Sequence, residues 1–431
     1  MHQFSLPEEV WVHVFLFLPI SDQLSVRSSC KFFMRLIDRP LFWKNATLCI
    51  EKIHTFTCHS WRTLRKRKIA SVVVVKAREK EWKQLVLRLP WIQSVTVDVC
   101  TVGVINSLTQ FKQLTRLVLR RCVCPSLTSL SALRQLSHLS VCDVVCAPTA
   151  DIINALSQLT NLTSLHYHVG SKPIPTAAFH HLLQSLAKLT HLSLKMGSNQ
   201  VSDSNQAMFF PPINHKPVAL ILEDRQRSLP ALISLELLNY TDPILSPVAL
   251  RCLPSLKVLT VQYTDLSLMP QPCHLKTWLS EIPIQELNIS LGYQLGVYAR
   301  SVPPTVQRLS LKGVMADLKA LRELAQQVPD LLHLHMDLCS YKRQSFIAEV
   351  PCLFPKLQSL AIRHYNLNVD EFFGLAQLSH LKHLVILDPN TGQNSALTDL
   401  SQKMHIQTNY RVNVITLSGS KEQMSCLCAK Q

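Results

Sequence analysis

Residues 114–122 read LTRLVLRRC, and this stretch decides the fold. Leu114, Leu117 and Leu119 occupy its first, fourth and sixth positions, which predicts a short strand with one buried face. The same apolar spacing recurs along most of the chain, usually every 22–28 residues. Recurrence at that period indicates stacked repeats, because one such strand cannot bury its apolar face alone. The pattern begins at Ile69, Ile92, Leu114, Leu136, Leu162, Leu189, Leu232, Leu256, Ile284, Val306, Leu331, Leu357, Leu381 and Val412.

The repeat resembles the leucine-rich repeat, whose unit carries asparagine or cysteine at its ninth position. Cys100, Cys122 and Cys339 match that position. The resemblance implies an α/β solenoid in which parallel strands form a concave sheet and helices cover the convex side. Helical spacing of apolar residues over 176–186 and 317–328 agrees with this arrangement. We expect the family's buried polar ladder to be incomplete, because elsewhere the ninth position holds Val144, Tyr240, Thr264 or Gly292.

The repeat pattern also divides the chain. We expect the solenoid over residues 69–417, with a loop inserted at 197–228 where two pattern starts lie 43 residues apart. Residues 418–431 are expected to form a C-terminal tail, and residues 49–68 a basic linker. The polar, proline-containing loop is either functional or an idle surface excursion.

Residues 1–48 do not fit the repeat and predict a compact helical segment. Ser5, Pro7 and Glu8 together form a helix start signal, and Pro19 ends that helix. The strings SLPEEV at 5–10, FLP at 17–19, CK at 30–31 and LFW at 41–43 resemble the F-box, a three-helix family motif. Phe33, where the family usually has tryptophan, departs from that pattern, and Gln23 and Ser29 are also atypical. The alternative is a helical cap over the open end of the solenoid.

The F-box resemblance implies docking onto the adaptor Skp1, and through it assembly with the cullin and RING subunits of an SCF ubiquitin ligase. An F-box directly before leucine-rich repeats is the usual layout of substrate-recognition subunits, in which catalysis belongs to the partners. The residues that fall on the family's Skp1-contacting positions are Leu6, Pro7, Val10, Val14, Phe15, Leu18 and Pro19, with Trp43 on its closing tryptophan.

The chain is strongly basic, with 44 Lys and Arg residues against 28 Asp and Glu and a formal charge of +16. Ten basic residues lie between 61 and 88, five of them within 62–68. Such a run fits a nuclear localisation signal or a phosphate-binding patch, and equally a solvated joint. The positive charge and the basic run support an alternative to a ligase subunit, namely a non-ligase scaffold or a nucleic-acid-associated protein. Because no nucleic-acid-binding module is recognisable, we do not expect nucleic acid as a partner.

The third, fifth and seventh residues of each repeat are expected to face the concave side, because the first, fourth and sixth point into the core. That surface is basic and rich in histidine, which favours a protein substrate that is acidic or phosphorylated. The predicted substrate-binding residues are Arg116, Arg120, His138, His166, His168, His191, Lys195, Arg308, Lys312, His333, His335 and Arg363.

Four of these histidines, His138, His166, His168 and His191, fall on three successive strands that lie about 5 Å apart. That distance is short enough for zinc binding in principle. We nevertheless expect no metal, because no supporting carboxylate or thiolate is evident beside them.

Catalytic signatures are missing from the sequence, which has no G-x-S-x-G, H-E-x-x-H, P-loop or kinase motif and only 9 glycines. We therefore expect neither an enzyme nor a cofactor. The longest apolar stretches fall well short of the ~18 residues that a membrane span needs, and residues 1–9 do not form a secretory signal. We expect a protein of the cytoplasm or nucleus without a membrane partner.

Overall fold

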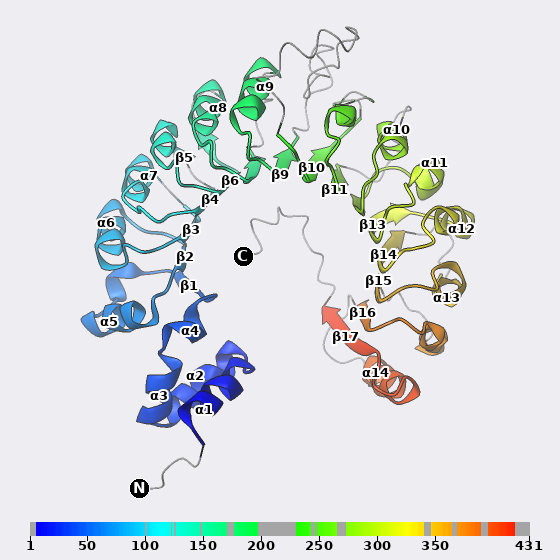
Figure 1. Cartoon of the computed structure of the whole chain (residues 1–431), viewed down its shortest axis with the longest axis horizontal. Helices are drawn as coiled ribbons and strands as arrows, with labels where there is room; N and C mark the ends of the chain where they lie inside the picture. The colour runs from blue at the N-terminus through cyan, green and yellow to red at the C-terminus, as the bar shows by residue number, and fades with distance from the viewer. Residues whose placement is uncertain are drawn as a thin grey trace. The chain divides into compact units, whose positions relative to one another are not determined.

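The computed structural model describes residues 6–99, 101–121, 123–124, 126–146, 149–169, 176–196, 230–242, 245, 247, 249–264, 273–339, 346–363, 369–388 and 395–418. The chain divides into two compact units, Met1–Leu162 and Thr163–Gln431. In each unit parallel strands follow one another, and helices or single helical turns connect them (Figure 1). The predicted fold class, an α/β solenoid of leucine-rich repeats after a small helical segment, is confirmed. The predicted loop 197–228, and the predicted tail beyond Ser418, lie outside the described residues.

The first unit begins with four helices: α1 (Glu8–Leu16), α2 (Ile20–Ser29), α3 (Lys31–Ile37) and the single turn α4 (Pro40–Trp43). Its parallel strands are β1 (Thr47–Ile50), β2 (Ser71–Val74), β3 (Ser94–Val97), β4 (Arg116–Arg120) and β6 (His138–Cys142). A separate short pair joins β5 (Val123–Cys124) to β7 (Val145–Cys146). The connecting helices are α5 (Cys58–Arg67), α6 (Glu79–Arg88), α7 (Val102–Leu108), η2 (Thr128–Ala132) and α8 (Thr149–Ser157).

The second unit continues the same alternation. Its parallel strands are β8 (Ser164–His168), β9 (His191–Lys195), β10 (Ser234–Tyr240), β11 (Val258–Tyr263), β12 (Glu286–Ser290), β13 (Arg308–Met315), β14 (His333–Cys339), β15 (Ser359–Arg363), β16 (His383–Asp388) and β17 (Asn413–Ser418). The longer connecting helices are α9 (Thr176–Ser185), α10 (His274–Glu281), α12 (Leu318–Gln327), η7 (Val369–Gln377) and α14 (Ser395–Gln407). In the described part of the chain, no helix has both the length and the apolar character needed to cross a bilayer.

The repeat pattern coincides with the buried side of each sheet. All fourteen predicted starting residues, from Ile69 to Val412, have at most 2% of their surface exposed. The register places leucine beside leucine: Leu235 lies opposite Leu259, and Leu287 opposite Leu309. Because strands in a sheet lie only about 4.8 Å apart, each leucine is covered by its equivalents in the adjacent repeats. The third, fifth and seventh residues occupy the other face, which we call the open face of the sheet.

Residues 49–68 differ from the expected linker. Strand β1 pairs with β2 in register, Thr47 opposite Ser71 and Ile50 opposite Val74, and α5 follows it. This segment is therefore a first repeat of the sheet. The pattern missed it because Asn45 stands at the position where the other repeats begin with an apolar residue, and Asn45 is exposed.

An aromatic cluster stands where the family's polar ladder is incomplete. The buried Asp242 carboxylate accepts hydrogen bonds from the Tyr240 hydroxyl at 2.8 Å and the Tyr293 hydroxyl at 2.6 Å. The rings of Tyr240 and Tyr263 pack edge to face, with centroids 5.6 Å apart. Gly292 adopts a φ of +79°, and a Cβ there would meet the Tyr263 ring at 2.3 Å, so this turn needs glycine. Tyrosine side chains thus fill the space at the C-terminal ends of β10, β11 and β12.

Leu117→Asp is expected to destabilise the first unit by several kcal/mol, because Leu117 is fully buried between Val95 and Leu139. Urea unfolding followed by circular dichroism measures the loss, and limited proteolysis reports whether adjacent repeats open with it. Gln113→Asp, at an exposed position before the same strand, is the control and should change the free energy of unfolding by less than about 0.5 kcal/mol. Wild-type stability of Leu117→Asp would contradict the assigned register.

Candidate functional site

The N-terminal helices pack around an aromatic core. Trp11 and Phe15 lie one turn apart on α1, and both rings contact Phe33 of α3 with centroids 5.0 Å away. The two contacts are edge to face, the arrangement favoured by aromatic pairs. Phe33 departs from the family's usual residue, but its aromatic ring still fills the centre of the segment between Trp11 and Phe15.

Gln23, the second departure, is a buried residue of α2 with 6% of its surface exposed. Its side-chain amide donates to the carbonyl oxygens of Phe15 at 3.0 Å and Leu18 at 2.9 Å. The last carbonyl groups of a helix have no partner within the helix, so a buried helix end needs such donors. Gln23 thus closes the C-terminal end of α1 and fixes the angle between α1 and α2.

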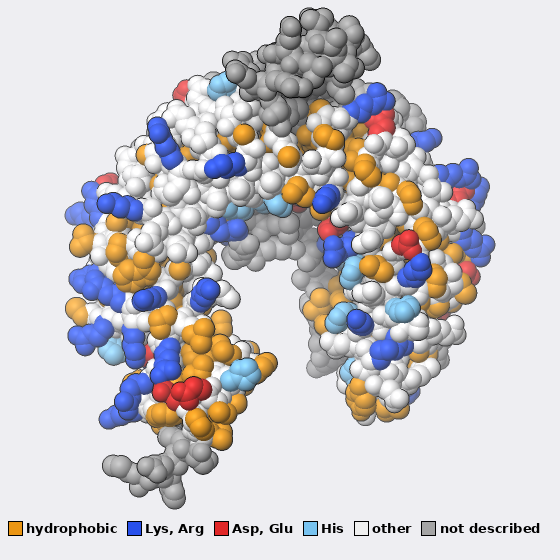
Figure 2. Space-filling model, in the orientation of Figure 1, with side chains coloured by type: hydrophobic (Ala, Val, Ile, Leu, Met, Phe, Trp, Pro, Cys, Tyr) orange, Lys and Arg blue, Asp and Glu red, His pale blue; other side chains and the backbone are white. Residues whose placement is uncertain are grey.

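Apolar side chains gather on the outside of these same helices (Figure 2). Phe17 is the extreme case, with 78% of its surface exposed, followed by Leu41 at 54% and Ile20 at 52%. A concentrated apolar surface of this kind marks an interaction site rather than ordinary solvent exposure. We call this the N-terminal apolar surface; its residues are Leu6, Val10, Val14, Leu16, Phe17, Ile20, Leu24, Met34 and Leu41.

The structure separates the predicted adaptor-contacting residues into two groups. Leu6, Pro7, Val10, Val14 and Pro19 are exposed, and Leu18 is half-buried. Two predictions are corrected: Phe15 and Trp43 are core residues, with 4% and 7% of their surface exposed. Phe15 faces the aromatic core because it lies one turn after Trp11, and the Trp43 indole nitrogen donates to the Ile37 carbonyl oxygen at 2.5 Å. Sequence reasoning missed Phe17, which belongs to the FLP string that carries the resemblance, and Ile20, which follows that string.

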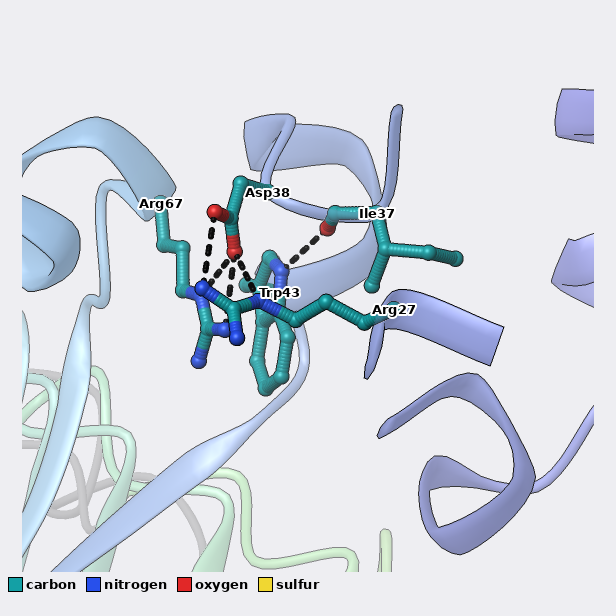
Figure 3. Close-up of polar contacts among 5 residues, drawn as sticks. All are labelled: Arg27, Ile37, Asp38, Trp43 and Arg67. Atoms are coloured by element: carbon teal, nitrogen blue, oxygen red, sulfur yellow. Dashed lines mark hydrogen bonds and ion pairs between the residues drawn. The ribbon is translucent and has the colours of Figure 1, made fainter. Parts of the chain in front are cut away.

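A buried ion cluster joins these helices to the first repeat (Figure 3). The Asp38 carboxylate, which follows α3, accepts hydrogen bonds from Arg27 Nε at 2.8 Å and Nη2 at 3.1 Å. Arg67, at the end of α5, donates to the same carboxylate through Nε at 2.8 Å. The Arg67 guanidinium also lies over the Trp43 ring, 3.7 Å from its centroid. One carboxylate therefore connects α2, α3 and the first repeat.

The electrostatics of Asp38 depend on both arginines. Burial by itself would raise the pKa of Asp38, but the hydrogen bonds from Arg27 and Arg67 outweigh it and hold that pKa below its ordinary value. Burial lowers the pKa of Arg67, against the opposing effect of Asp38. Because the folded pKa of Asp38 lies below the unfolded one, its stabilisation is present above the unfolded value and is lost as pH falls through the folded value.

The helical segment has a counterpart among known protein families. Residues 4–49 match the F-box-like family model. The match spans all four N-terminal helices, including the residues that form the N-terminal apolar surface. No curated protein matches the chain as a whole at a significant level.

Solved structures similar to this chain include an internalin of Listeria monocytogenes, with 13% identity, coverage of 79% of this chain and 88% of that one, and a TM-score of 0.37. The Toll–Spatzle complex of Drosophila matches with 12% identity, coverage of 86% and 54%, and a TM-score of 0.40. The complex of Rad7 and Elc1 in yeast matches with 15% identity, coverage of 84% and 89%, and a TM-score of 0.46.

Beyond the F-box-like segment, the predicted substrate-binding residues lie on the open face as half-buried or exposed side chains, with one exception. Arg116 and Arg120 of β4 and His138 of β6 are half-buried in the first unit. In the second unit His191 and Arg308 are exposed. His168 is the exception and is corrected: only 1% of its surface is exposed, and its Nε2 lies 2.7 Å from the Ser193 hydroxyl, so it is not a direct contact for a large partner. The remaining residues, all half-buried, are His166, Lys195, Lys312, His333, His335 and Arg363.

A row of charged residues crosses the open face from β12 to β14. The register places Glu286 opposite Arg308, and Arg308 opposite His333. Burial lowers the pKa of His333, and the charge of Arg308 lowers it further, against the opposing effect of Glu286. This imidazole therefore becomes cationic only at a lower pH than an ordinary histidine, which leaves Arg308 as the more constant positive charge of the row.

Arg363 is a second correction on this face. Its Nε and Nη2 donate to the two oxygens of Asp337 at 2.5 and 2.6 Å, a bidentate pair between adjacent strands β14 and β15. The pair neutralises the arginine, so Arg363 is not a cation poised for an acidic substrate. Sequence could have indicated this, because Asp337 and Arg363 occupy the seventh position of consecutive repeats.

Asp38→Asn is expected to lower the free energy of unfolding of the first unit by about 2 kcal/mol near neutral pH, since it leaves two half-buried guanidinium groups without their anion. The difference from wild type should shrink as pH falls below about 4, because the Asp38 carboxyl of the unfolded chain is then protonated while that of the folded chain is still charged. Urea unfolding between pH 7 and pH 3 measures both effects. Asp399→Asn, which removes the exposed pair with Lys403 in α14, is the control and should cost less than about 0.5 kcal/mol at every pH. A constant difference across that pH range would contradict the role of Asp38.

Proposed function

We propose that this protein is a non-catalytic substrate-recognition subunit of an SCF-type ubiquitin ligase. The F-box-like segment binds a Skp1-type adaptor, and the repeats bind a protein substrate. Ubiquitin transfer belongs to the cullin and RING subunits recruited through the adaptor, in the cytoplasm or nucleus. The protein then works by effective concentration, because it holds the substrate near the charged ubiquitin carrier.

The observation that carries this proposal is the N-terminal apolar surface. Nine large apolar side chains within residues 6–41 are at least 37% exposed, and they belong to the segment that matches the F-box-like family. The core beneath them is complete without a partner, since Trp11, Phe15 and Phe33 already contact one another. A helical cap for the solenoid would bury its apolar side chains against the repeats, whereas these point to solvent. The surface therefore supports a docking role over a capping role.

The open face of the sheet supports the substrate-binding half of the proposal. Arg308 is exposed there, and Lys312 lies further along the same strand and on the same face. A partner that carries carboxylates or phosphate groups would match this charge. With Arg363 neutralised by Asp337, Arg308 is the exposed one among the predicted arginines and lysines of the second unit, and so the best candidate for such a contact.

Phe17→Ala is expected to weaken binding of purified Skp1 by about 30-fold, because truncation of an aromatic anchor at a desolvated interface costs about 2 kcal/mol. Isothermal titration of Skp1 into the full chain measures the change. The double variant Leu6→Ala with Pro7→Ala should weaken binding by more than about a hundredfold, since it removes two contacts.

Leu87→Ala is the matched control for this experiment. Leu87 of α6 is 77% exposed, nearly as much as Phe17, but lies outside the F-box-like segment. Its truncation should leave Skp1 affinity unchanged. If wild-type protein does not bind Skp1, or if both N-terminal variants bind as wild type does, the adaptor role is wrong and a scaffold outside any ligase becomes the better interpretation.

Arg308→Glu is expected to weaken binding of a poly-glutamate peptide by roughly three- to tenfold at low salt, the effect of reversing one exposed charge. Fluorescence anisotropy with a labelled peptide measures the affinity, which should also fall as salt is added. Lys319→Glu makes the same charge reversal on α12, the helix that follows β13 in the same repeat, and should have little effect. Equal losses in the two variants would show that net charge, and not the open face, attracts the peptide.

A further inference from the structure

Three side chains with metal-binding groups converge on the open face of the second unit. His166 and His168 come from β8 and Glu236 from β10, and their ligand atoms all lie within 4.8 Å of one another. His166 and Glu236 are half-buried, and His168 is buried. The two imidazole rings lie 5.8 Å apart between centroids, at an angle of 68°. The histidines alone were predicted to lack a carboxylate, and Glu236 supplies one.

The convergence follows from the register of three strands. Ser193 of β9 lies opposite His166 on one side and opposite Glu236 on the other, so the three residues form one row across the open face. All three occupy the fifth position of consecutive repeats. Strands two apart in a sheet are separated by about 9.6 Å, too far for short side chains to meet. The small serine between them leaves room for the imidazole and the carboxylate to approach each other above it.

Ser193 also orients two of the three groups. Its hydroxyl donates to the Glu236 carboxylate and lies 2.7 Å from Nε2 of His168, and only 3% of Ser193 is exposed. These contacts hold the His168 and Glu236 side chains together on the open face, above β9, although they come from the strands on either side of it. Beneath the row, Leu165, Leu192 and Leu235 are at most 2% exposed, so the backbone that carries the ligands is fixed by the core. A hydroxyl that positions ligands in this way is a common support of metal sites.

We propose that His166, His168 and Glu236 form a binding site for a divalent transition-metal ion of the zinc class. Two imidazoles and one carboxylate are a ligand set that such ions prefer, and they bind it with metal–ligand distances of about 2.0–2.2 Å. In a tetrahedral site of that size the ligand atoms lie about 3.3 Å apart, so the present atoms need to close by at most about 1.5 Å. Rotation of the half-exposed His166 and Glu236 side chains supplies this movement without displacing a strand. Three protein ligands leave one position of the ion for water or for a donor group of a bound partner.

Two other side chains of β9, Lys195 and His191, lie near the site but are not among its ligands. Lys195 lies two residues after Ser193 on β9 and on the same face, so its positive charge disfavours a cation bound beside it, and it supplies no ligand. His191, at the other end of β9, is exposed, and its Nδ1 lies 2.8 Å from the Thr190 hydroxyl. It is not one of the three converging groups, although the sequence placed it beside them. His191 therefore provides a control on the same face.

The test uses the full-length chain, stripped with EDTA and then dialysed against micromolar ZnCl₂. Atomic emission counts the bound zinc, and titration with Co²⁺ reports the coordination geometry through its visible absorption. We expect wild type to hold one more equivalent of zinc than Glu236→Gln or His166→Ala, with affinity at this site reduced by more than about a hundredfold in either variant. His191→Ala should keep the wild-type count.

Two results would overturn the proposal: wild type that binds no zinc, or Glu236→Gln and His166→Ala that bind as many equivalents as wild type. In the second case the metal occupies other residues of the chain. Circular dichroism and thermal unfolding of the metal-free variants check that both retain the fold, and Glu236→Gln preserves the shape of the side chain and a hydrogen-bond acceptor for Ser193. Zinc should also raise the unfolding temperature of wild type more than that of either variant.

Discussion

Each strand of this protein has two edges to pair and one leucine-rich side to cover, and a single repeat can do neither for itself. The parallel register between neighbouring strands solves both problems at once, because it hydrogen-bonds the edges and brings Leu235, Leu259 and Leu287 into contact. The same register sets which side chains lie next to one another on the open face. The fifth residues of successive repeats form one row and the seventh residues form another, so a side chain meets partners that are distant in sequence but equivalent in repeat position.

That dependence explains how much of the molecule could be predicted. Regular spacing of the buried residues was sufficient for the strands from Ile69 to Val412, because burial leaves a strong periodic signal in sequence. Strand β1 was missed where one polar residue, Asn45, interrupts the signal although the strand pairs normally with β2. The open face was harder, since residue type alone does not show which groups satisfy one another. Arg363 and Asp337 form a pair, and Ser193 joins His168 to Glu236, only because the register sets them side by side.

The N-terminal segment follows a different rule. Its resemblance to the F-box lies in short strings of residues, and such strings do not show which members face inward. Phe15 and Phe17 are two positions apart on a helix, so they must point to different sides, and the structure places Phe15 in the core and Phe17 in solvent. Gln23 and Phe33, which depart from the family's usual residues, pack inside the segment, whereas Ser29, the third departure, is exposed.

The division between core and surface in this segment bears directly on docking. An exposed apolar surface contributes no burial energy to its own unit, which would amount to about 25 cal/mol per Å² if it were covered, so other contacts must hold the unit together. Here the aromatic core and the Asp38 cluster supply those contacts. Arg67 of the first repeat binds the Asp38 carboxylate and stacks on the Trp43 ring, and so connects the helices to that repeat. Val10, Phe17 and Ile20 are therefore not required to fold the segment and remain available for a partner. Because Arg67 belongs to α5 and Asp38 to the end of α3, the helices that carry this surface are fixed to the repeat that begins the sheet.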